Sequence, residues 1–232
     1  MARPSLRRAL RRSGVTPAPR PTRAERGPRS QSLPPPPRIF LPGEEAVVPP
    51  PPLDPARLFG RGAPLELEIG VGKGRFLLAE AAAHPEHDFL GLEIEPGYAA
   101  LAAEKASRLG LGNLRVYAVD AKPFVSLRLP EASLTRLHVY FPDPWPKKRH
   151  HKRRLFDAGF ARAAARALVA GGELRVASDH AEYFTVIVEV LNAEPLLERL
   201  PDSDWSPGTS YAVKFAEEGR AIGKGIWRRR PN

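Results

Sequence analysis

Five short apolar runs separated by helical patterns place the strongest limit on how this chain can fold. The runs expected to form strands are Leu65–Ile69, Phe89–Ile94, Leu114–Val119, Leu137–Phe141 and Gly172–Ala177. The expected helices are Gly74–Ala83, Pro96–Leu109, Leu155–Val169 and Tyr183–Leu191, and Gly225–Arg229 is expected to close the sheet as a last strand. Strands and helices that alternate at this spacing predict a doubly wound, mostly parallel α/β sheet with helices on both faces.

Residues 1–55 differ from the rest of the chain in composition. They hold 15 of the 27 prolines, and residues 1–38 hold ten arginines against a single acid, Glu25. Because the segment lacks the apolar periodicity that would offset its chain entropy, we expect residues 1–55 to be a disordered Arg/Pro-rich extension and residues 56–232 to be the folded domain. The extension could be a solvated tail, an arm that attracts RNA or an organellar transit peptide, although its prolines would interrupt an amphipathic helix.

Composition excludes several classes of function. The chain has no cysteine, which removes disulfide scaffolds, thiolate metal sites and cysteine nucleophiles. No stretch approaches the ~18 consecutive apolar residues of a membrane span, and no apolar core of a secretory signal is present, so the cytoplasm is the expected location. The net charge of +10 lies almost wholly in the first 38 residues, so the expected folded domain is nearly neutral.

The first expected strand runs directly into a glycine-rich turn, Gly70-Val71-Gly72-Lys73-Gly74. In a doubly wound sheet this turn borders the ligand crevice at the carboxyl ends of the strands. The spacing is G-x-G-x-G rather than the G-x-G-x-x-G of a dinucleotide site, and Glu68 precedes it, where a carboxylate would repel a phosphate. Glu68 would instead attract a cationic group, such as the amino group of a methionine moiety.

Two more carboxylates lie at the ends of the next two expected strands. Glu93 ends the second strand, where an acid can reach the hydroxyls of a ribose, and Asp120 ends the third, where it can accept a hydrogen bond from the amino group of adenine. A cation, a diol and an adenine together describe S-adenosylmethionine, which is therefore the expected cofactor. A nicotinamide cofactor is the alternative, and both Glu68 and the glycine spacing disfavour it.

The fourth expected strand leads into the most distinctive segment of the chain. Two prolines flank Asp143 and fix its backbone, so its carboxylate is expected to be held rigidly over the crevice. Trp145 offers a flat surface, and six Lys or Arg and two His fill the eight positions from Lys147 to Arg154. Beside a rigid acid and an aromatic ring, this basic run predicts contact with RNA phosphates. Its histidines have no acidic or cysteine companions at metal-ligand spacing, so no metal site is expected.

These motifs together resemble the tRNA (guanine-N7-)-methyltransferase family, whose fold is a Rossmann-like methyltransferase sheet. The likeness covers residues 64–227. It rests on the glycine turn and on Gly91-x-Glu93, Asp120-Ala121, Phe141–Leu155, Ser178-Asp179, Thr209-x-Tyr211, Lys214, Gly219 and Ile222. The Pro-Asp-Pro-Trp-x-Lys-x-Arg-His-x-Lys-Arg-Arg string is highly specific, whereas many methyltransferases share the glycine turn.

The resemblance implies an enzyme that transfers a methyl group from S-adenosylmethionine to N7 of guanine 46 in the tRNA variable loop. The cofactor contacts that it implies are Glu68, Gly70, Gly72, Gly74, Glu93, Asp120, Ala121 and Asp143, with Asp143 also the catalytic residue. The implied substrate contacts are Lys147, Asp179, Thr209, Ser210 and Tyr211. The basic run would contact RNA through Arg149, His150, His151, Lys152, Arg153 and Arg154. The family typically has Thr-x-x-Glu, but this chain has Ala212 in place of the glutamate, so one substrate-side carboxylate is missing.

The chemistry of guanine N7 suits this set of residues. N7 carries an exposed lone pair and no proton, so methylation needs no general base and most of the rate comes from alignment. Two other functions remain open. An amino-group methyltransferase has a similar turn of acid or amide, prolines and an aromatic residue, and it would methylate an exocyclic amine. A non-enzymatic RNA-binding protein with the same fold would bind RNA without affinity for S-adenosylmethionine.

Overall fold

The structure of the chain is a computed structural model that describes residues 52–201 and 205–231. Residues 1–51 of the expected extension lie outside the described residues, so the extension and its boundary after residue 55 stay predictions. The first described element is the short helix α2 (Pro55–Phe59), which the Asp54 carboxylate caps. In the part of the chain that the structure describes, no helix is both long and apolar enough to cross a membrane.

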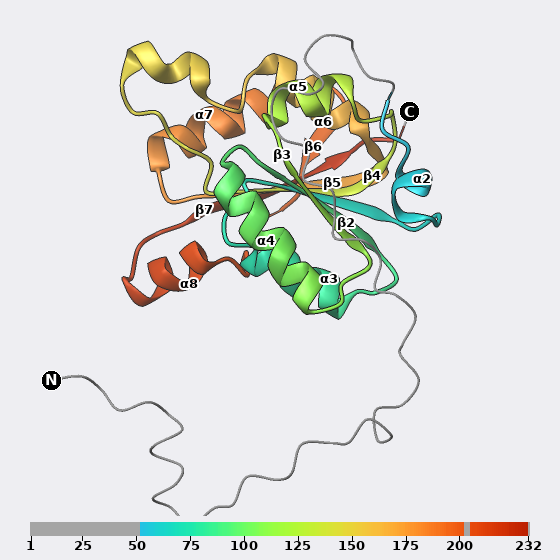
Figure 1. Cartoon of the computed structure of the whole chain (residues 1–232). Helices are drawn as coiled ribbons and strands as arrows, with labels where there is room; N and C mark the ends of the chain where they lie inside the picture. Colours follow the sequence, from blue (N-terminus) through green and yellow to red (C-terminus); the bar gives the residue numbers. More distant parts are fainter. Residues whose placement is uncertain (1–51, 202–204, 232) are drawn as a thin grey trace, which may run out of the picture. The chain divides into compact units, whose positions relative to one another are not determined.

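The described strands form one seven-stranded sheet in the order β3-β2-β1-β4-β5-β7-β6 (Figure 1). They are β1 (Leu65–Ile69), β2 (Asp88–Glu93), β3 (Leu114–Ala118), β4 (Leu134–Tyr140), β5 (Leu168–Ser178), β6 (Leu197–Arg199) and β7 (Gly223–Arg229). Strands β1 to β5 pair in parallel, whereas β7 runs antiparallel to both β5 and β6. The prediction of a doubly wound, mostly parallel sheet is confirmed.

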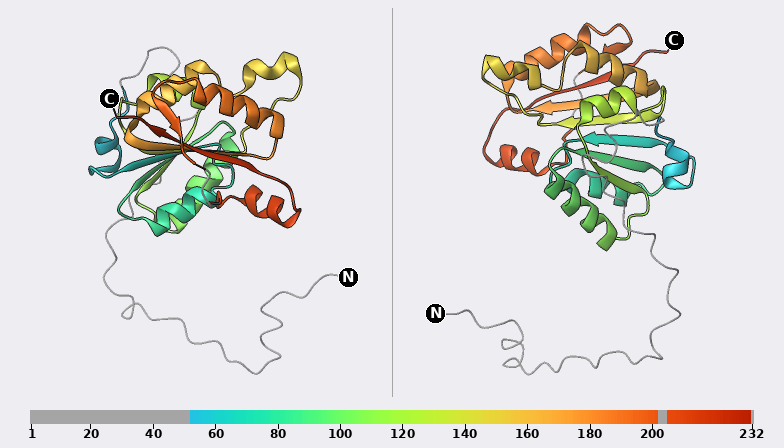
Figure 2. Two further views of the ribbon diagram at one scale, coloured as in Figure 1. Left: turned by 180° about the vertical axis from the view of Figure 1, so that it is seen from behind. Right: turned by 45° about the horizontal axis from the view of Figure 1, so that its top comes forward.

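Helices cover both faces of this sheet. They are α3 (Arg75–Ala83), α4 (Pro96–Arg108), α5 (Ala121–Leu127), α6 (Ala158–Ala167), α7 (Ala181–Asn192) and α8 (Ser210–Glu217), with one 3-10 helix, η1 (Lys148–Arg153). Helices α3 and α4 lie on one face, and α5, α6 and α7 lie on the other, as the two views of Figure 2 show. The sheet is therefore the middle layer of three.

Each face of the sheet buries its own apolar core. The larger core joins α5, α6 and α7 to the sheet and contains Phe160, Tyr183 and Trp227. The smaller core joins α3 and α4 to β2 and β3 and contains Leu77 and Phe89. The buried positions of α4 are all alanine, so this helix can lie close to the strands. The apolar side chains whose spacing predicted these helices are thus buried against the sheet.

The structure contains five elements that the sequence pattern did not indicate, α2, α5, η1, α8 and β6. Three of them have only 5, 7 and 3 residues, too few to show a helical or strand period. The helix expected over Leu155–Val169 was too long at both ends. It begins at Ala158, because the Asp157 carboxylate accepts a hydrogen bond from the Phe160 N–H (2.8 Å) and caps it. It ends at Ala167, and β5 follows without a loop.

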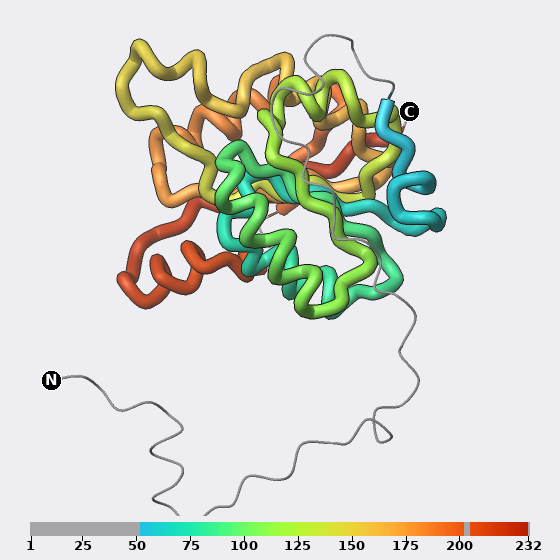
Figure 3. Tube along the Cα trace, viewed as in Figure 1, coloured from blue at the N-terminus to red at the C-terminus, as the bar shows by residue number. Residues whose placement is uncertain are grey.

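The carboxyl ends of β1 to β5 meet at one edge of the sheet, which we call the strand-end edge. Two connections lie at this edge and can be followed in Figure 3. One is the turn from β1 into α3, and the other is the segment after β4 that contains η1. Helix α8 also lies there, whereas α2 lies at the opposite edge (Figure 1). Because ligands of doubly wound sheets bind beyond the carboxyl ends of the strands, the residues at this edge form the candidate site.

Gly91 in β2 lies so close to its neighbours that a side chain there must displace them. A Cβ at this position would be 2.6 Å from Leu77 Cδ2 and 2.7 Å from Val71 Cγ2. We therefore expect Gly91→Ala to lower the free energy of unfolding by about 1–3 kcal/mol, as measured by urea denaturation. Gly112→Ala is the control, because a Cβ at Gly112 would meet no atom within 4 Å. Equal stabilities of the two variants would contradict the close packing.

Candidate functional site

The glycine turn after β1 has a left-handed backbone at each glycine. The φ angles of Gly70, Gly72 and Gly74 are 80°, 53° and 80°. The Gly70 N–H donates to the Leu92 carbonyl (2.8 Å), and the Gly72 N–H donates to Glu93 Oε2 (2.7 Å). A Cβ at Gly70 or Gly72 would meet no atom within 4 Å, so one side of the turn is open. These two positions need glycine for the backbone conformation rather than for packing.

Glu93 connects the glycine turn to the end of β2. Besides the bond from Gly72, its carboxylate accepts a hydrogen bond from the Glu95 N–H through Oε1 (2.9 Å). The side chain is buried. Each carboxylate oxygen keeps a second lone pair, so Glu93 can still accept a hydrogen bond from a ligand hydroxyl. Glu93 thus holds the turn in place and remains a candidate ribose ligand.

Glu68 is a buried acid at the strand-end edge with a carboxyl oxygen that is unsatisfied in the part of the chain that the structure describes. It is 3% exposed, and its carboxyl accepts a hydrogen bond from the Leu77 backbone N–H. Among the described residues, Oε2 has no hydrogen-bond partner. Burial and the neighbouring Glu93 carboxylate raise the pKa of Glu68 well above its ordinary value. A buried carboxyl oxygen without a partner is costly, and a cationic ligand group would remove that cost.

Asp120 and Ala121 lie where β3 gives way to α5. Asp120 Oδ1 accepts a hydrogen bond from the Lys122 N–H (3.0 Å) and caps the helix, and the Asp120 side chain is exposed. Ala121, the first residue of α5, is buried in the larger apolar core. Asp120 can therefore face a ligand at the strand-end edge, whereas the Ala121 side chain packs into the protein.

Asp143 lies in a turn after β4 whose backbone is strained on both sides. Phe141 and Trp145 have positive φ angles, 54° and 42°, which residues other than glycine rarely adopt. The Phe141 N–H donates to the Ala177 carbonyl (2.7 Å), so the turn begins where pairing with β5 ends. Within residues 52–201 and 205–231, no hydrogen bond or ion pair engages the Asp143 carboxylate, which is exposed. The turn thus presents an available carboxylate.

Arg154, at the end of the basic run, is buried rather than exposed. Its side chain is 6% exposed, its Nε–H donates to the Pro144 carbonyl (2.8 Å), and its guanidinium lies 4.7 Å from the centroid of the Tyr183 ring. The Lys122 ammonium donates to the Arg154 carbonyl (2.8 Å). Arg154 therefore fastens the turn that carries Asp143 to the domain. Its expected contact with RNA stays a prediction.

The other members of the basic run are more accessible. Arg149, Lys152 and Arg153 are exposed, whereas His150 and His151 are partly buried. The Arg153 guanidinium lies 4.9 Å from the centroid of the Trp145 ring, and the His150 ring meets the same ring edge-on at 5.8 Å. Trp145 thus organises the basic side chains next to the Asp143 turn.

Helix α8 brings the expected substrate residues to the ends of β4 and β5. Thr209 is buried, and its hydroxyl accepts a hydrogen bond from the Ala212 N–H (3.0 Å), so it caps the helix. The ring of Tyr211, which is exposed, lies 5.8 Å from the Phe141 ring. Ser210 is exposed as well.

Asp179 and Lys147 complete the expected substrate set. Asp179, just after β5, forms an ion pair with Arg220. The Arg220 guanidinium also lies 3.9 Å from the centroid of the Phe215 ring in α8. Lys147 is exposed immediately before η1. The structure therefore brings Asp143, Asp179 and α8 to one region, while their roles toward a substrate stay predictions.

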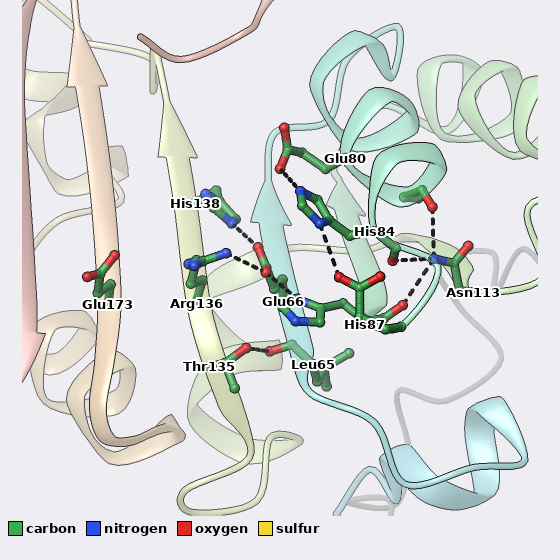
Figure 4. Close-up of polar contacts among 12 residues, drawn as sticks. Leu65, Glu66, Glu80, His84, His87, Asn113, Thr135, Arg136, His138 and Glu173 are labelled. Carbon is green, nitrogen blue, oxygen red and sulfur yellow. Dashed lines mark hydrogen bonds and ion pairs between the residues drawn. The ribbon is translucent and has the colours of Figure 1, made fainter. Parts of the chain in front are cut away.

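The structure also contains a buried polar cluster that the sequence analysis missed (Figure 4). Glu66, in β1, is 1% exposed. Its Oε2 lies 2.8 Å from His138 Nε2, and its Oε1 accepts from Arg136 (2.8 Å) and lies 2.7 Å from His87 Nδ1. His138 Nδ1 lies 2.8 Å from the Tyr140 hydroxyl oxygen. The alternation Leu-Glu-Leu-Glu in β1 was the available signal, because one face of a central strand must bury both acids.

The contacts of the cluster determine its protonation. Burial opposes ionisation of Glu66, but the hydrogen bonds of His138 and His87 and the charge of Arg136 lower its pKa from 4.5 to about 2. Burial lowers the pKa of His138, against the opposing effect of Glu66. His138 is therefore neutral, with its Nε2–H donating to Glu66 and its Nδ1 accepting from Tyr140. Burial also raises the pKa of Tyr140, which keeps its hydroxyl protonated.

Comparisons with known proteins agree with this geometry. Residues 62–229 match the protein family described as "Putative methyltransferase". The tRNA (guanine-N(7)-)-methyltransferase of Methylococcus capsulatus is 44% identical over 177 residues, which cover 75% of this chain and 77% of that protein. The protein of the same name from Alkalilimnicola ehrlichii is 49% identical over 179 residues, with coverages of 76% and 75%. The crystal structure of the 16S rRNA methyltransferase KamB has a TM-score of 0.56 at 17% identity and covers 75% of this chain and 92% of that chain, a likeness of fold alone.

The Glu66 cluster predicts how stability depends on pH. The pKa of Glu66 is 4.5 when unfolded and about 2 when folded, so its ionisation stabilises the fold fully above about pH 4.5. That contribution is lost as the pH falls toward 2. We expect wild-type protein to lose up to about 3 kcal/mol more than Glu66→Gln over this range, measured by urea denaturation at each pH.

His138 acts in the same direction, because its lowered pKa lets the unfolded state take up a proton first as the pH falls. Glu104→Gln, which changes an exposed carboxylate of α4, should keep the wild-type pH dependence. Identical pH profiles for wild type and Glu66→Gln would show that Glu66 is not a low-pKa group.

Proposed function

Because the chain belongs to the tRNA (guanine-N(7)-)-methyltransferase family, we propose that it transfers a methyl group from S-adenosylmethionine to N7 of guanine 46 in the variable loop of tRNA. The observation that carries this proposal lies at the strand-end edge. There the Glu68 oxygen that has no hydrogen-bond partner in the described part of the chain and the exposed carboxylate of Asp143 occur together with a basic segment. These groups suit a cationic cofactor beside an RNA base.

The residues at the ends of β1, β2 and β3 fit S-adenosylmethionine. Glu68 would hold the ammonium group, since its buried Oε2 has no partner among the described residues. Glu93 would accept from the ribose hydroxyls, and Asp120 from the adenine amino group. The open side of the glycine turn leaves room for the backbone to approach the cofactor. When bound, S-adenosylmethionine supplies an electrophilic methyl group on a positively charged sulfur.

Asp143 and Asp179 would orient the guanine. Their carboxylates can accept hydrogen bonds from guanine N1–H and from its amino group, which leaves N7 free to face the methyl group. Neither residue needs to remove a proton, because N7 carries none. Both negative charges would also favour the positive charge that develops on the purine during methylation. Since Asp179 pairs with Arg220 in this structure, guanine must replace or share that ion pair.

Helix α8 would complete the guanine pocket. Tyr211 and Phe141 supply neighbouring aromatic rings beside the Asp143 turn, and such rings can stack on a base. Ala212, where the family typically has glutamate, supplies no carboxylate, so any contact from this position comes from the backbone. Thr209 acts first as the cap of α8, which sets the position of Tyr211. Lys147 would contact the substrate from the other side of the turn.

The basic run would hold the tRNA backbone. Arg149, Lys152 and Arg153 are exposed and can reach phosphates directly. His150 and His151 are partly buried and would contribute hydrogen bonds. Arg154 would act by holding the Asp143 turn, through its bond to the Pro144 carbonyl.

Methyl transfer to unmodified tRNA tests the proposal. We expect label from S-adenosylmethionine to appear as 7-methylguanosine, and mapping should place it at guanine 46. Asp143→Asn should lower kcat by about 100-fold, because the substituted amide loses the negative charge that favours the transition state. Asp54→Asn is the matched control, since it changes an exposed carboxylate at the opposite edge of the sheet and asparagine can still cap α2.

Other products would decide between other functions. Methyl on an exocyclic amine would identify an amino-group methyltransferase. RNA binding without methyl transfer or S-adenosylmethionine affinity would identify a binding protein. Full turnover by Asp143→Asn with unchanged substrate affinity would remove Asp143 from its assigned role.

The salt dependence of tRNA binding tests the role of the basic run. Arg153→Ala removes one exposed cation, so we expect weaker binding and a slope of log affinity against log salt that is smaller by about 1. The affinity can be measured by fluorescence anisotropy over a series of salt concentrations. Arg57→Ala, in α2 at the opposite edge, should leave the slope unchanged. An unchanged slope for Arg153→Ala would exclude a phosphate contact there.

A further inference from the structure

The buried cluster around Glu66 has no part in the function proposed so far. Glu66 and His138 lie on one face of the adjacent strands β1 and β4, and Tyr140 is the last residue of β4. The exposed fractions of the three residues are 1%, 2% and 7%. Two contacts of 2.8 Å connect them in a chain, from Glu66 to His138 and from His138 to Tyr140. This chain runs through the centre of the sheet toward the strand-end edge.

With Glu66 ionised and His138 neutral, each hydrogen bond in the chain has one direction. Arg136 can only donate, so it holds Oε1 of Glu66 as an acceptor, and the other oxygen accepts from His138 Nε2–H. That bond leaves His138 Nδ1 without a hydrogen, so it accepts from the Tyr140 hydroxyl. The acid in β1 thus selects the tautomer of His138, and the tautomer holds the ring of Tyr140 (Figure 4 shows the Glu66 side of the chain).

Tyr140 touches both sides of the candidate site. It directly precedes Phe141, where the Asp143 turn begins. Its ring meets the ring of Phe76 edge-on, with centroids 5.0 Å apart at 85°. Phe76 is the second residue of α3, which starts directly after the glycine turn. On another side, the Tyr140 ring lies 5.8 Å from Trp205. The orientation of the Tyr140 ring therefore affects the position of the start of α3 relative to the end of β4.

We propose that Glu66, His138 and Tyr140 form a positioning relay that sets the Asp143 turn relative to the glycine turn. Tyr140 acts through packing and His138 through its tautomer, and none of the three touches a reacting atom. Packing alone would not need the hydroxyl, because phenylalanine fills the same space. The hydroxyl adds a directional bond that allows one ring orientation. The consequence for methyl transfer rests on the proposed function, whereas the relay itself does not.

Removing the Tyr140 hydroxyl tests the relay with the least disturbance of packing. Tyr140→Phe should lower kcat for methyl transfer by about 10-fold, since a small misplacement of reacting groups is costly in rate. The Kd for tRNA should stay within twofold, because the exposed basic side chains are unchanged. Thr135→Val is the matched control. It removes a hydrogen bond between the same two strands, from the Thr135 hydroxyl to the Leu65 carbonyl (3.0 Å), near the far end of β4 (Figure 4).

The tautomer of His138 gives a readout that a purely structural role would not move. In Glu66→Gln, the amide oxygen is expected to face Arg136, so the amide nitrogen donates to His138 Nε2. His138 then carries its hydrogen on Nδ1, and Tyr140 must accept instead of donate. Nitrogen-15 NMR of the imidazole should show the Nε2–H tautomer in wild type and the Nδ1–H tautomer in Glu66→Gln. The kcat of Glu66→Gln should fall less than that of Tyr140→Phe, because a reversed bond between His138 and Tyr140 is still formed.

Amide exchange at Phe141 tests the relay without any assay of activity. The Phe141 N–H donates to the Ala177 carbonyl (2.7 Å) at the end of β4. Its exchange rate should rise about 10-fold in Tyr140→Phe, should rise less in Glu66→Gln, where a reversed bond holds the ring, and should not rise in Thr135→Val. This result would stand even if the wild-type protein transferred no methyl group to tRNA, an outcome that would overturn only the proposed function.

Three results would overturn the relay. The first is a wild-type His138 with its hydrogen on Nδ1. The second is a Phe141 exchange rate that is the same in Tyr140→Phe and in Thr135→Val. The third is an active wild-type enzyme whose kcat is unchanged by Tyr140→Phe. If Tyr140→Phe does not fold, Glu66→Gln alone gives both the tautomer and the exchange rate.

Discussion

Two carboxylates lie on one buried face of β1, and the surrounding structure must compensate the cost of burying them. Glu66 and Glu68 alternate with leucines, so both acids point toward the face that α3 covers. Burial of a carboxylate is costly unless cations or hydrogen-bond donors compensate it. Glu66 obtains three such partners from β4 and from the loop before β2. Glu68 lies two residues nearer to the strand-end edge. One of its carboxyl oxygens has no partner among the described residues. One acid therefore forms bonds within the interior, and the other keeps an oxygen that a ligand could engage.

In the candidate site, hydrogen bonds in the interior hold the two turns, and the carboxylate that could meet a substrate is exposed. Arg154 holds the Asp143 turn through the Pro144 carbonyl, and Glu93 holds the glycine turn through the Gly72 N–H. Asp143 itself is exposed and unengaged within the described part of the chain. Such a division suits a reaction that depends on alignment, because the supporting contacts can fix the geometry while the exposed groups meet the substrate. The backbone of Phe141 is strained because its φ is positive. The strain is tolerated because pairing with the neighbouring strand fixes the residue at which the turn begins.

Much of the fold was predictable from the sequence because the strands and long helices have clear periods. Helix α8 was not, because its signal is a threonine cap followed by only eight helical residues. The acids at the strand ends were predictable as a set, since parallel strands end at one edge. The role of Arg154 was not, because a run of like charges gives no sign that one member is buried against Tyr183. Glu66 was missed for a related reason. Its partners, His87 and His138, are 21 and 72 residues away in sequence and become neighbours only when β1 lies between β2 and β4.

Proton release on binding of S-adenosylmethionine tests most directly whether Glu68 receives the cationic cofactor. Because the pKa of Glu68 is raised by burial, part of the free protein carries a proton on this carboxyl. The ammonium group of the cofactor would favour the ionised form and expel that proton. Isothermal titration calorimetry in buffers of different ionisation enthalpy measures the number of protons released. Release by wild-type protein that disappears in Glu68→Gln is the predicted result. Tight binding with no proton release, or with the same release in Glu68→Gln, would contradict this assignment.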